Sequence, residues 1–203
     1  MVSRRDSPPH TERVERRRRA GGESKLTDEQ LAERMFAGHE KATRQLLERF
    51  HRPLYGTLLR LTKNPADAEE LFQETFLRAL RAGSRFDSSR RFKPWIFTIA
   101  VNLARDRARR ARHWATPELR AAEDLPEKTQ QRTESQWILR VDLTRALDEL
   151  PEHHREVIEL RYFEGMEEPE IAEAASIPRG TVKSRLHHAM RKMRDLMATG
   201  ETT

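Results

Sequence analysis

Apolar side chains recur every three or four positions along most of the chain, which is the spacing of one face of an α-helix. The first such run follows Thr27, an N-capping residue that would form a capping box with Gln30, and it stops at Gly38. A run around Phe50 comes next, and a further run begins after Pro53. No segment has the alternating pattern of a β-strand, so we predict an all-α fold.

The clearest helix is the segment KNPADAEELFQETFLRALRAG. Asn64 is placed to cap it, Pro65 suits its first position, and Gly83 suits its end. Four of its apolar residues are predicted to face the core: Leu71, Phe72, Phe76 and Leu80. After a turn-like segment, SRFDSSRRF, the spacing predicts another helix over 93–112.

The helical spacing fails in the middle of the chain, where two prolines punctuate a polar stretch of net charge −2. We therefore predict two small helical modules, over 26–113 and 136–197, joined by a flexible linker over 114–135. Residues 1–25 are rich in arginine and almost free of apolar side chains, which predicts a disordered basic arm. A short tail over 198–203 ends the chain.

Composition narrows the classes of function. Hydrophobic residues make up 36% and charged residues 35%, which favours small helical modules over one large core. The net charge of +6 favours an anionic partner, either nucleic acid or a lipid surface. The chain has no Cys, which excludes disulfides, thiolate zinc sites and a cysteine nucleophile. No apolar run approaches the roughly 20 residues that span a bilayer, so we expect a cytoplasmic protein without membrane insertion.

The segment EPEIAEAASIPRGTVKSRLHHAM has the spacing of a helix-turn-helix, with helices predicted over 169–175 and 178–197. Ala172 lets the two helices cross closely, Ser176 occupies the turn, and Val182 anchors the second helix against the first. A polar and basic face suited to the major groove points away: Arg179, Lys183, Ser184, His187 and His188. An ordinary helical hairpin with a solvated basic face would have the same spacing, so this motif alone leaves both interpretations open.

Three segments together resemble the extracytoplasmic-function class of bacterial sigma factors. LPEHHREVIELRYFEGMEEPEIAEAASIPRGTVKSRL resembles the fourth conserved region of that family, and NPADAEELFQETFLRAL resembles its second region. FKPWIFTIAVNLARDRARR resembles the strand-opening helix of the second region. The resemblance implies an alternative sigma factor that binds the RNA polymerase core, recognises the minus-35 and minus-10 promoter elements, and opens the strands. It implies no cofactor and no catalytic residue.

For polymerase binding, the resemblance points to an acidic stripe on the helix that Asn64 caps. Three carboxylates there fall at helical spacing, with an amide beside them, and the stripe would meet the clamp helices of the largest polymerase subunit: Asp67, Glu70, Gln73 and Glu74. The C-terminal module would meet the flap of the second-largest subunit. A solvated helix face would have the same composition.

For the minus-10 element, residues 90–112 hold eight bases and one acid, a net charge of +7, near Phe92 and Trp95. Such density beside an aromatic platform suits binding to phosphates and bases. The resemblance implies that a flipped base of the non-template strand is held here, by residues at the matching positions: Ala82, Phe86, Trp95, Ile99, Asn102, Arg105 and Arg109. Trp95 and Ile99 could instead be core residues.

For the minus-35 element, the resemblance adds two positions on the second helix of the helix-turn-helix. The matching set is Arg179, Thr181, Lys183, Ser184, Arg185, His187 and His188. The sequence departs from the family at His188, where arginine is common, and a neutral imidazole gives up a fixed charge. It also departs at Ser176, which replaces a frequent turn glycine.

Other classes of function fit the sequence less well. The eight histidines include two adjacent pairs, but no carboxylate stands at a metal-type spacing on the same face, so we predict neither a metal site nor catalysis. A free-standing helix-turn-helix regulator that binds duplex DNA without polymerase is the main alternative, and it would need neither the acidic stripe nor the Trp95 region. The resemblance also implies an anti-sigma factor as a partner, which can hold the protein at the membrane.

Overall fold

The computed structural model describes residues 26–83, 86–114, 143 and 145–200. Within these ranges the regular elements are helices and no strand occurs, which confirms the predicted all-α fold. The predicted basic arm, almost all of the predicted linker and the first residues of the second module lie outside the described residues.

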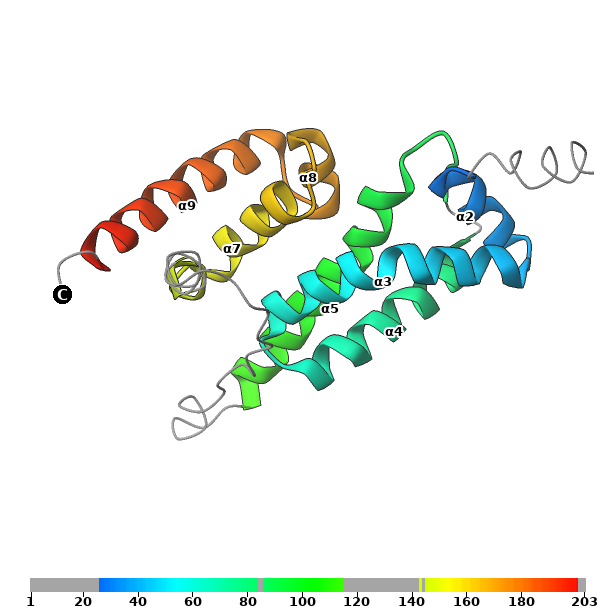
Figure 1. The fold of residues 1–203 in the computed structure, drawn as a ribbon, viewed down its shortest axis with the longest axis horizontal. Coiled ribbons are helices and arrows are strands. Elements are labelled where there is room, and N and C mark those ends of the chain that lie inside the picture. Colours follow the sequence, from blue (N-terminus) through cyan, green and yellow to red (C-terminus); the bar gives the residue numbers. More distant parts are fainter. Residues whose placement is uncertain (1–25, 84–85, 115–142, 144, 201–203) are drawn as a thin grey trace, which may run out of the picture.

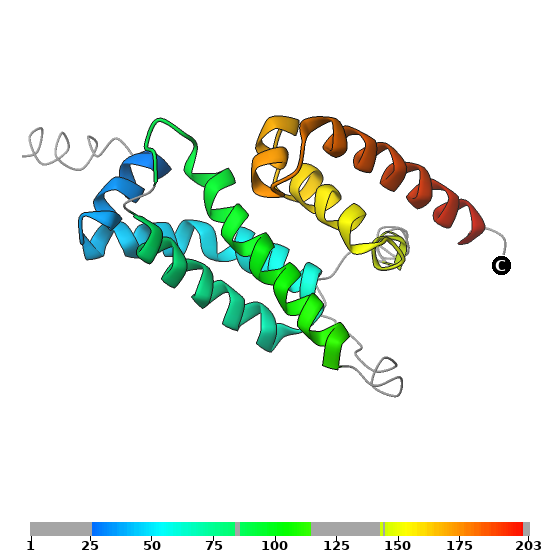
Figure 2. The ribbon, with the colours of Figure 1, turned by 180° about the vertical axis from the view of Figure 1, so that it is seen from behind.

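The N-terminal module is a bundle of α2 (Asp28–Phe36), α3 (Glu40–Thr62), α4 (Pro65–Ala82) and α5 (Phe92–Trp114). The long helix α3 packs against the other three, and α4 lies along α5 (Figures 1 and 2). These helices bury their apolar stripes against one another, as the 3.6-residue period requires.

The predicted helix ends are confirmed at both capping residues. The Thr27 hydroxyl accepts from the Gln30 amide, and the Gln30 side chain accepts in return from the Thr27 amide, which completes the capping box. The Asn64 side chain accepts from the first free amides of α4, which ends at Ala82 as predicted. Gly83 has a right-handed φ of −56°, so its lack of a side chain serves a different purpose: a Cβ there would collide with the Phe36 ring.

The two predicted runs on either side of Pro53 form one continuous helix, α3. Proline removes one helical hydrogen bond and normally ends or kinks a helix. Here buried side chains stand on both sides of the proline, including Phe50 and Leu54, and they hold the helix to its neighbours. Packing therefore overrides the local signal.

The C-terminal module contains α7 (Glu152–Ile158), the π-helical η3 (Glu159–Phe163), α8 (Glu168–Ala174) and α9 (Arg179–Gly200). The predicted helices of the helix-turn-helix are confirmed to within three residues at each end. Ile171 of α8 and Val182 of α9 are both fully buried, which confirms Val182 as the anchor of the second helix.

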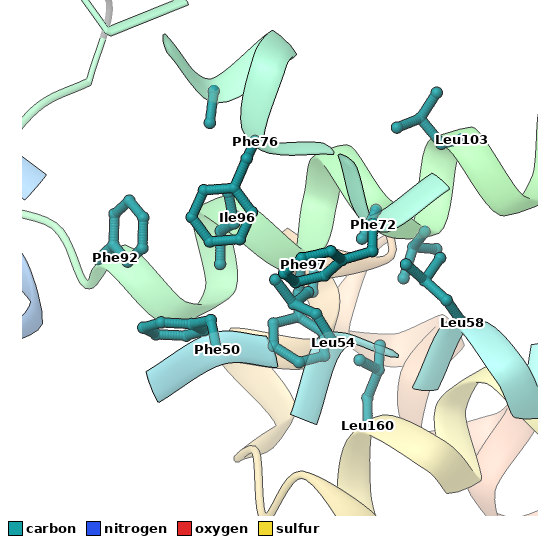
Figure 3. Packing of buried hydrophobic residues seen from close by; sticks show 14 of the residues in the cluster. Phe50, Leu54, Leu58, Phe72, Phe76, Phe92, Ile96, Phe97, Leu103 and Leu160 are labelled. Carbon is teal, nitrogen blue, oxygen red and sulfur yellow. The ribbon is translucent and has the colours of Figure 1, made fainter. Parts of the chain in front are cut away.

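The two modules pack directly against each other, which the sequence did not predict. Val157, Leu160 and Ile171 of the C-terminal module belong to the same buried cluster as the apolar core of the N-terminal bundle. Figure 3 shows Leu160 in this cluster with Leu54 and Phe97. The contact runs mainly between α5 and α8, with α3 meeting α7 and η3.

Candidate nucleic-acid interface

The outer face of α9 is exposed as predicted. Val182, Ala189 and Met193 turn inward and are buried, so the helix is fixed to its own module along one side. The five residues predicted to face away are all exposed: Arg179, Lys183, Ser184, His187 and His188. The two positions that the resemblance added, Thr181 and Arg185, are half-buried at the edge of this face.

Two of the exposed residues of α9 have charged neighbours that change the potential of this face. Arg179 lies 3.4 Å from the Glu168 carboxylate of α8, so the face is less positive at its start than its composition suggests. His188 lies with its Nδ1 3.5 Å from an Arg191 amino group. The arginine therefore adds a fixed charge beside the position where His188 replaces one.

Ser176 has a φ of 53°, in the left-handed region where glycine is preferred. The expectation that this turn calls for glycine is therefore confirmed at the level of the backbone. A serine there carries a conformational cost, on the order of 1 kcal/mol, that the packing of α8 against α9 offsets.

The aromatic residues near the start of α5 form one group. The Trp95 ring lies 5.0 Å from the Phe86 ring and 5.9 Å from the Phe36 ring, measured between centroids, and all three side chains are half-buried. Phe92, which was expected beside Trp95, lies with its ring 5.7 Å from the Trp95 ring, but it is fully buried, with its ring 5.3 Å from Phe50. Phe92 therefore supports the Trp95 ring from the side of α5 that faces α3.

The other predicted minus-10 residues lie in three environments. Ala82 and Ile99 are half-buried, while Asn102 and Arg109 are exposed. Arg105 points toward the C-terminal module, where its Nε and Nη2 donate to the two Glu156 carboxylate oxygens at 2.7 and 2.6 Å. The structure therefore brings Phe86 and Trp95 together and directs Arg105 elsewhere.

Burial at this contact changes the titration of its carboxylates. Burial raises the pKa of Glu156, against the opposing effect of its hydrogen bonds from Arg105. Burial likewise raises the pKa of Glu159, whose Oε1 has no hydrogen-bond partner among the described residues. Both carboxylates are nearly inaccessible because the modules are packed together.

The acidic stripe of α4 has partners within the N-terminal module. Arg107 of α5 binds Asp67 at 2.7 Å and Glu70 at 2.6 Å, and the hydrogen bond to Glu70 and the charge of Asp67 raise the pKa of Arg107. Glu74 is paired with Arg78 at 2.7 Å, and the Gln73 amide donates to Glu69. The stripe is therefore partly neutralised, although Glu70 and Gln73 stay exposed.

Sequence reasoning missed two exposed leucines beside this stripe. Leu77 and Leu80 are 48% and 44% exposed, whereas Leu71, Phe72 and Phe76 are buried as predicted. The assignment of Leu80 to the core was wrong, since Leu80 lies on an uncovered side of α4, whereas the adjacent Ala79 is fully buried. Leu77 follows Gln73 by four positions, so helical spacing could have placed it on the stripe.

Comparison with known proteins decides the family. The chain matches the family described as Sigma-70 region 2 over residues 46–113, and the family described as Sigma-70, region 4 over residues 140–193. It is 35% identical to the RNA polymerase sigma factor CarQ of Myxococcus xanthus, over 81% of this chain and 94% of CarQ. It is 36% identical to the ECF RNA polymerase sigma factor SigL of Mycobacterium tuberculosis, over 70% of this chain and 80% of SigL. The chain belongs to the extracytoplasmic-function sigma factors.

As a sigma factor, the protein acts with RNA polymerase in promoter-specific initiation of transcription, and a free-standing regulator is not favoured. Its fold is similar to that of CnrH, solved in complex with the cytosolic domain of CnrY, with a TM-score of 0.64, 27% identity and coverage of 85% and 97% of the two chains. It is also similar to RpoE of Bartonella quintana, solved with the anti-sigma factor NepR, with a TM-score of 0.65, 25% identity and coverage of 78% and 98%.

The described part of this sigma factor holds neither a membrane span nor a metal site. Within it, no helix is long and apolar enough to cross a membrane. No group of three or more histidine or acidic side chains in the same ranges could hold a metal ion.

Proposed function

We propose that this sigma factor reads its promoter with two separate surfaces, the outer face of α9 for the minus-35 element and the Trp95 end of α5 for the minus-10 element. The observation that carries this assignment is the exposed polar and basic side of α9, which stands opposite three buried apolar residues of the same helix. Such a helix can enter the major groove without disturbing its own module.

For the minus-10 element, we assign base contacts to the group around Trp95 and Phe86. Their rings lie 5.0 Å apart and are half-buried, so they offer a rigid aromatic wall against which an unpaired base can stack. Asn102 is exposed on the same helix and can supply amide hydrogen bonds to a base edge. Arg109 is 77% exposed and is placed to meet phosphate.

For polymerase binding, we assign the α4 stripe together with its two exposed leucines. A surface that combines Glu70 and Gln73 with Leu77 and Leu80 offers both charge and apolar area to a partner helix. This composition supports the assignment, because large exposed apolar residues beside a polar rim are typical of interaction sites.

The wider setting is also proposed. We expect a cytoplasmic protein whose region 2 and region 4 modules span 26–113 and 136–197, without catalysis of its own. RpoE was solved with an anti-sigma factor, NepR, and CnrH was solved with the cytosolic domain of another protein, CnrY. We therefore also expect an anti-sigma factor as a partner of this protein.

Transcription in vitro tests the proposal. Purified bacterial core polymerase, this protein and a library of genomic fragments should give transcripts that start at defined positions, and mapping those starts identifies both promoter elements. Core polymerase without the protein is the control. The absence of specific starts on every fragment would contradict the proposal.

Variants of α4 test the polymerase surface separately. Leu77→Ser combined with Leu80→Ser should weaken the affinity for core about thirtyfold, since each leucine withdrawn from an interface costs about 1 kcal/mol and 1.4 kcal/mol is a factor of ten. Glu33→Ser combined with Arg34→Ser is the control, because both residues are exposed on α2 of the same module and the double change leaves the net charge unaltered. Equal retention of the double variant and the control would remove α4 from the polymerase interface.

A further inference from the structure

The first residue of α9, Arg179, is tied to the first residue of α8, Glu168. The Arg179 Nε donates to the Glu168 carboxylate, with Nε and Oε2 3.4 Å apart. The two residues are 11 positions apart in the chain, so the contact joins the two helices of the helix-turn-helix. Arg179 belongs to the face that we assign to the minus-35 element, whereas Glu168 lies on the helix before it and has no role assigned so far.

The contact engages one side of the guanidinium and leaves its end free. A guanidinium has five N–H donors, and four of them sit on the two terminal nitrogens rather than on Nε. The Arg179 side chain is still 67% exposed, against 34% for Glu168. One N–H from each terminal nitrogen can donate to the O6 and N7 atoms of a guanine. The pair therefore presents a guanidinium whose reading end is available.

The two backbones that carry the pair are fixed to each other. Ile171 of α8 and Val182 of α9 are fully buried in the same apolar cluster. The turn between the helices is closed by a hydrogen bond from the Ile177 amide to the Ala172 carbonyl at 3.0 Å. Because the helices cannot shift relative to each other without breaking these contacts, the carboxylate approaches the guanidinium from a fixed direction.

The surface beside Arg179 is open to a duplex. A Cβ added at Gly180 would meet no atom of the other described elements within 4 Å, so none of them covers this first turn of α9. The first residues of the second helix are those that contact base edges in a helix-turn-helix. Arg179 therefore stands where a base pair can reach it.

We propose that Glu168 is a positioning residue for promoter recognition, which holds Arg179 so that the free end of its guanidinium donates to a guanine of the minus-35 element. The inference deepens the proposed function and rests on it, since it takes α9 to be the minus-35 surface. It adds a residue of α8 to the determinants of specificity, and it assigns guanine to one position of the element.

A carboxylate at this place acts on affinity and on specificity in opposite directions. It weakens binding to every sequence, because it repels the phosphates. An arginine without the carboxylate can turn to a phosphate when the base is wrong, and a phosphate contact carries no sequence information. When Glu168 holds Arg179, that freedom is lost before DNA arrives, so a sequence without the guanine leaves the donors unpaired. The pair therefore lowers affinity for wrong sequences more than for the right one.

Selection from a randomised promoter tests the inference. Holoenzyme assembled from core polymerase and the full chain is mixed with promoter fragments in which the mapped minus-35 element is randomised. Sequencing of bound and unbound fragments gives the base preference at each position and the relative affinity of each sequence. The wild type should prefer guanine at one position by about tenfold or more, which is the discrimination of a bidentate arginine contact.

Two variants of Glu168 separate its charge from its hydrogen bond. Glu168→Ala should reduce the guanine preference at that position about two- to tenfold, the ordering cost of one long side chain expressed as a ratio, and leave the other positions unchanged. Glu168→Gln keeps a side-chain oxygen that can accept from Arg179, so it should retain more of the preference. Glu149→Ala is the control, because it removes an exposed acid of the same module and should leave every preference unchanged.

Arg179→Ala locates the position concerned. It should abolish the guanine preference at the same position that Glu168→Ala affects. In the Arg179→Ala background, Glu168→Ala should cause no further change in any base preference, because its effect passes through the arginine. This coupling distinguishes positioning of Arg179 from a direct contact between Glu168 and DNA. Thermal unfolding of each variant checks that the helix-turn-helix is intact.

Several results would overturn the inference. Higher affinity of both Glu168 variants for all sequences alike, with base preferences unchanged, would mean that the carboxylate only repels DNA. An equal loss of preference in Glu168→Ala and Glu168→Gln would assign the effect to charge, and a loss that persists in the Arg179→Ala background would mean that Glu168 acts without the arginine. Normal selection by Arg179→Ala would overturn the inference alone. A wild-type holoenzyme that selects no minus-35 sequence would overturn the proposed function as well.

Discussion

The two basic helices of this sigma factor, α5 and α9, differ in what their charges meet. On α5, Arg105 and Arg112 are bound by carboxylates of the C-terminal module at 2.6 and 2.7 Å. On α9, Lys183 and His187 are exposed, and no ion pair of either is found within the described ranges. Equal density of basic residues in a sequence therefore does not mean equal availability to DNA.

The difference follows from where each helix sits. α9 contacts mainly α7 and α8 of its own module, so one side is buried and the other faces solvent. α5 lies against α3 and α4 on one side and α8 on another (Figures 1 and 2). A helix held between two modules offers its side chains partners that a helix at the edge does not have.

The largest expected effect comes from the apolar part of the module contact. Leu160→Ala should lower the free energy of unfolding by about 2–4 kcal/mol, because the fully buried side chain leaves a cavity between the modules. Urea unfolding measures the loss, and energy transfer between dyes attached at Ser88→Cys and Met190→Cys, one on each module, should report separation of the modules. Leu147→Ala, in the second apolar cluster of the C-terminal module, should cost a similar free energy but leave the energy transfer unchanged.

A second pair of variants separates the two DNA surfaces. Trp95→Ala should weaken binding of the minus-10 strand by about 1–3 kcal/mol, the value of one stacked base, and abolish permanganate-reactive opening at the promoter. Binding of minus-35 duplex should not change. His187→Ala should weaken binding of the minus-35 duplex and leave binding of the minus-10 strand unchanged. Trp95→Phe keeps an aromatic ring against Phe86 and should retain most of the minus-10 binding and strand opening. A loss as large as that of Trp95→Ala would contradict a stacking role for Trp95.

A third prediction concerns the pH dependence of the free energy of unfolding. It rests on His154 of α7, the helix that packs against α9. Partial burial lowers the pKa of His154, and the neighbouring His153, His188, Arg185 and Lys192 add to this shift. The unfolded chain therefore binds a proton at the ordinary pKa near 6.5 while the folded protein does not, so stability is retained above that pH and falls as the pH drops below it.

His154→Gln should flatten this loss, as read from urea unfolding between about pH 8 and about pH 5.5. At the upper end of that range the imidazole is neutral in both states, so the comparison of wild type and variant there gives the effect of shape alone. A variant that loses stability as steeply as the wild type would assign the pH dependence to other groups.

The smallest effect is expected at the turn between α8 and α9. Ser176→Gly should stabilise the protein by about 0.5–1 kcal/mol, because φ is 53° there and glycine adopts that conformation without steric cost. Thermal unfolding measures the gain. Gly165→Ala, at a φ of 65°, should shift stability by a similar amount in the opposite direction. No gain from Ser176→Gly would mean that the serine side chain compensates for its backbone.

Local signals predicted the helices well and failed where distant residues meet. Thr27 and Asn64 cap their helices as expected, since a cap involves residues only two or three positions apart. Leu80 was assigned to the core, and that assignment was wrong. The apolar period shows which residues share a face, but it does not show how much of that face the neighbouring helices cover.

Arg155 illustrates what no local pattern could supply. It is buried, and it donates to the backbone carbonyls of Leu147, Asp148 and Leu150, at the end of the helical segment that precedes α7. Its neighbour Glu156 binds Arg105 of the other module instead. Two adjacent residues of opposite charge thus hold two different contacts.

The sequence by itself determined the helices, most of their ends, and the division into two modules that resemble regions of a sigma factor. These follow from spacing and capping, which act within one or two helical turns. Only the tertiary structure decided which charges are free. Arg105 lies 51 positions from Glu156, and Arg90 lies 83 positions from Glu173. Such pairs form because buried apolar residues such as Leu160 and Ile171 bring the modules together, and no local property of the chain specifies that approach.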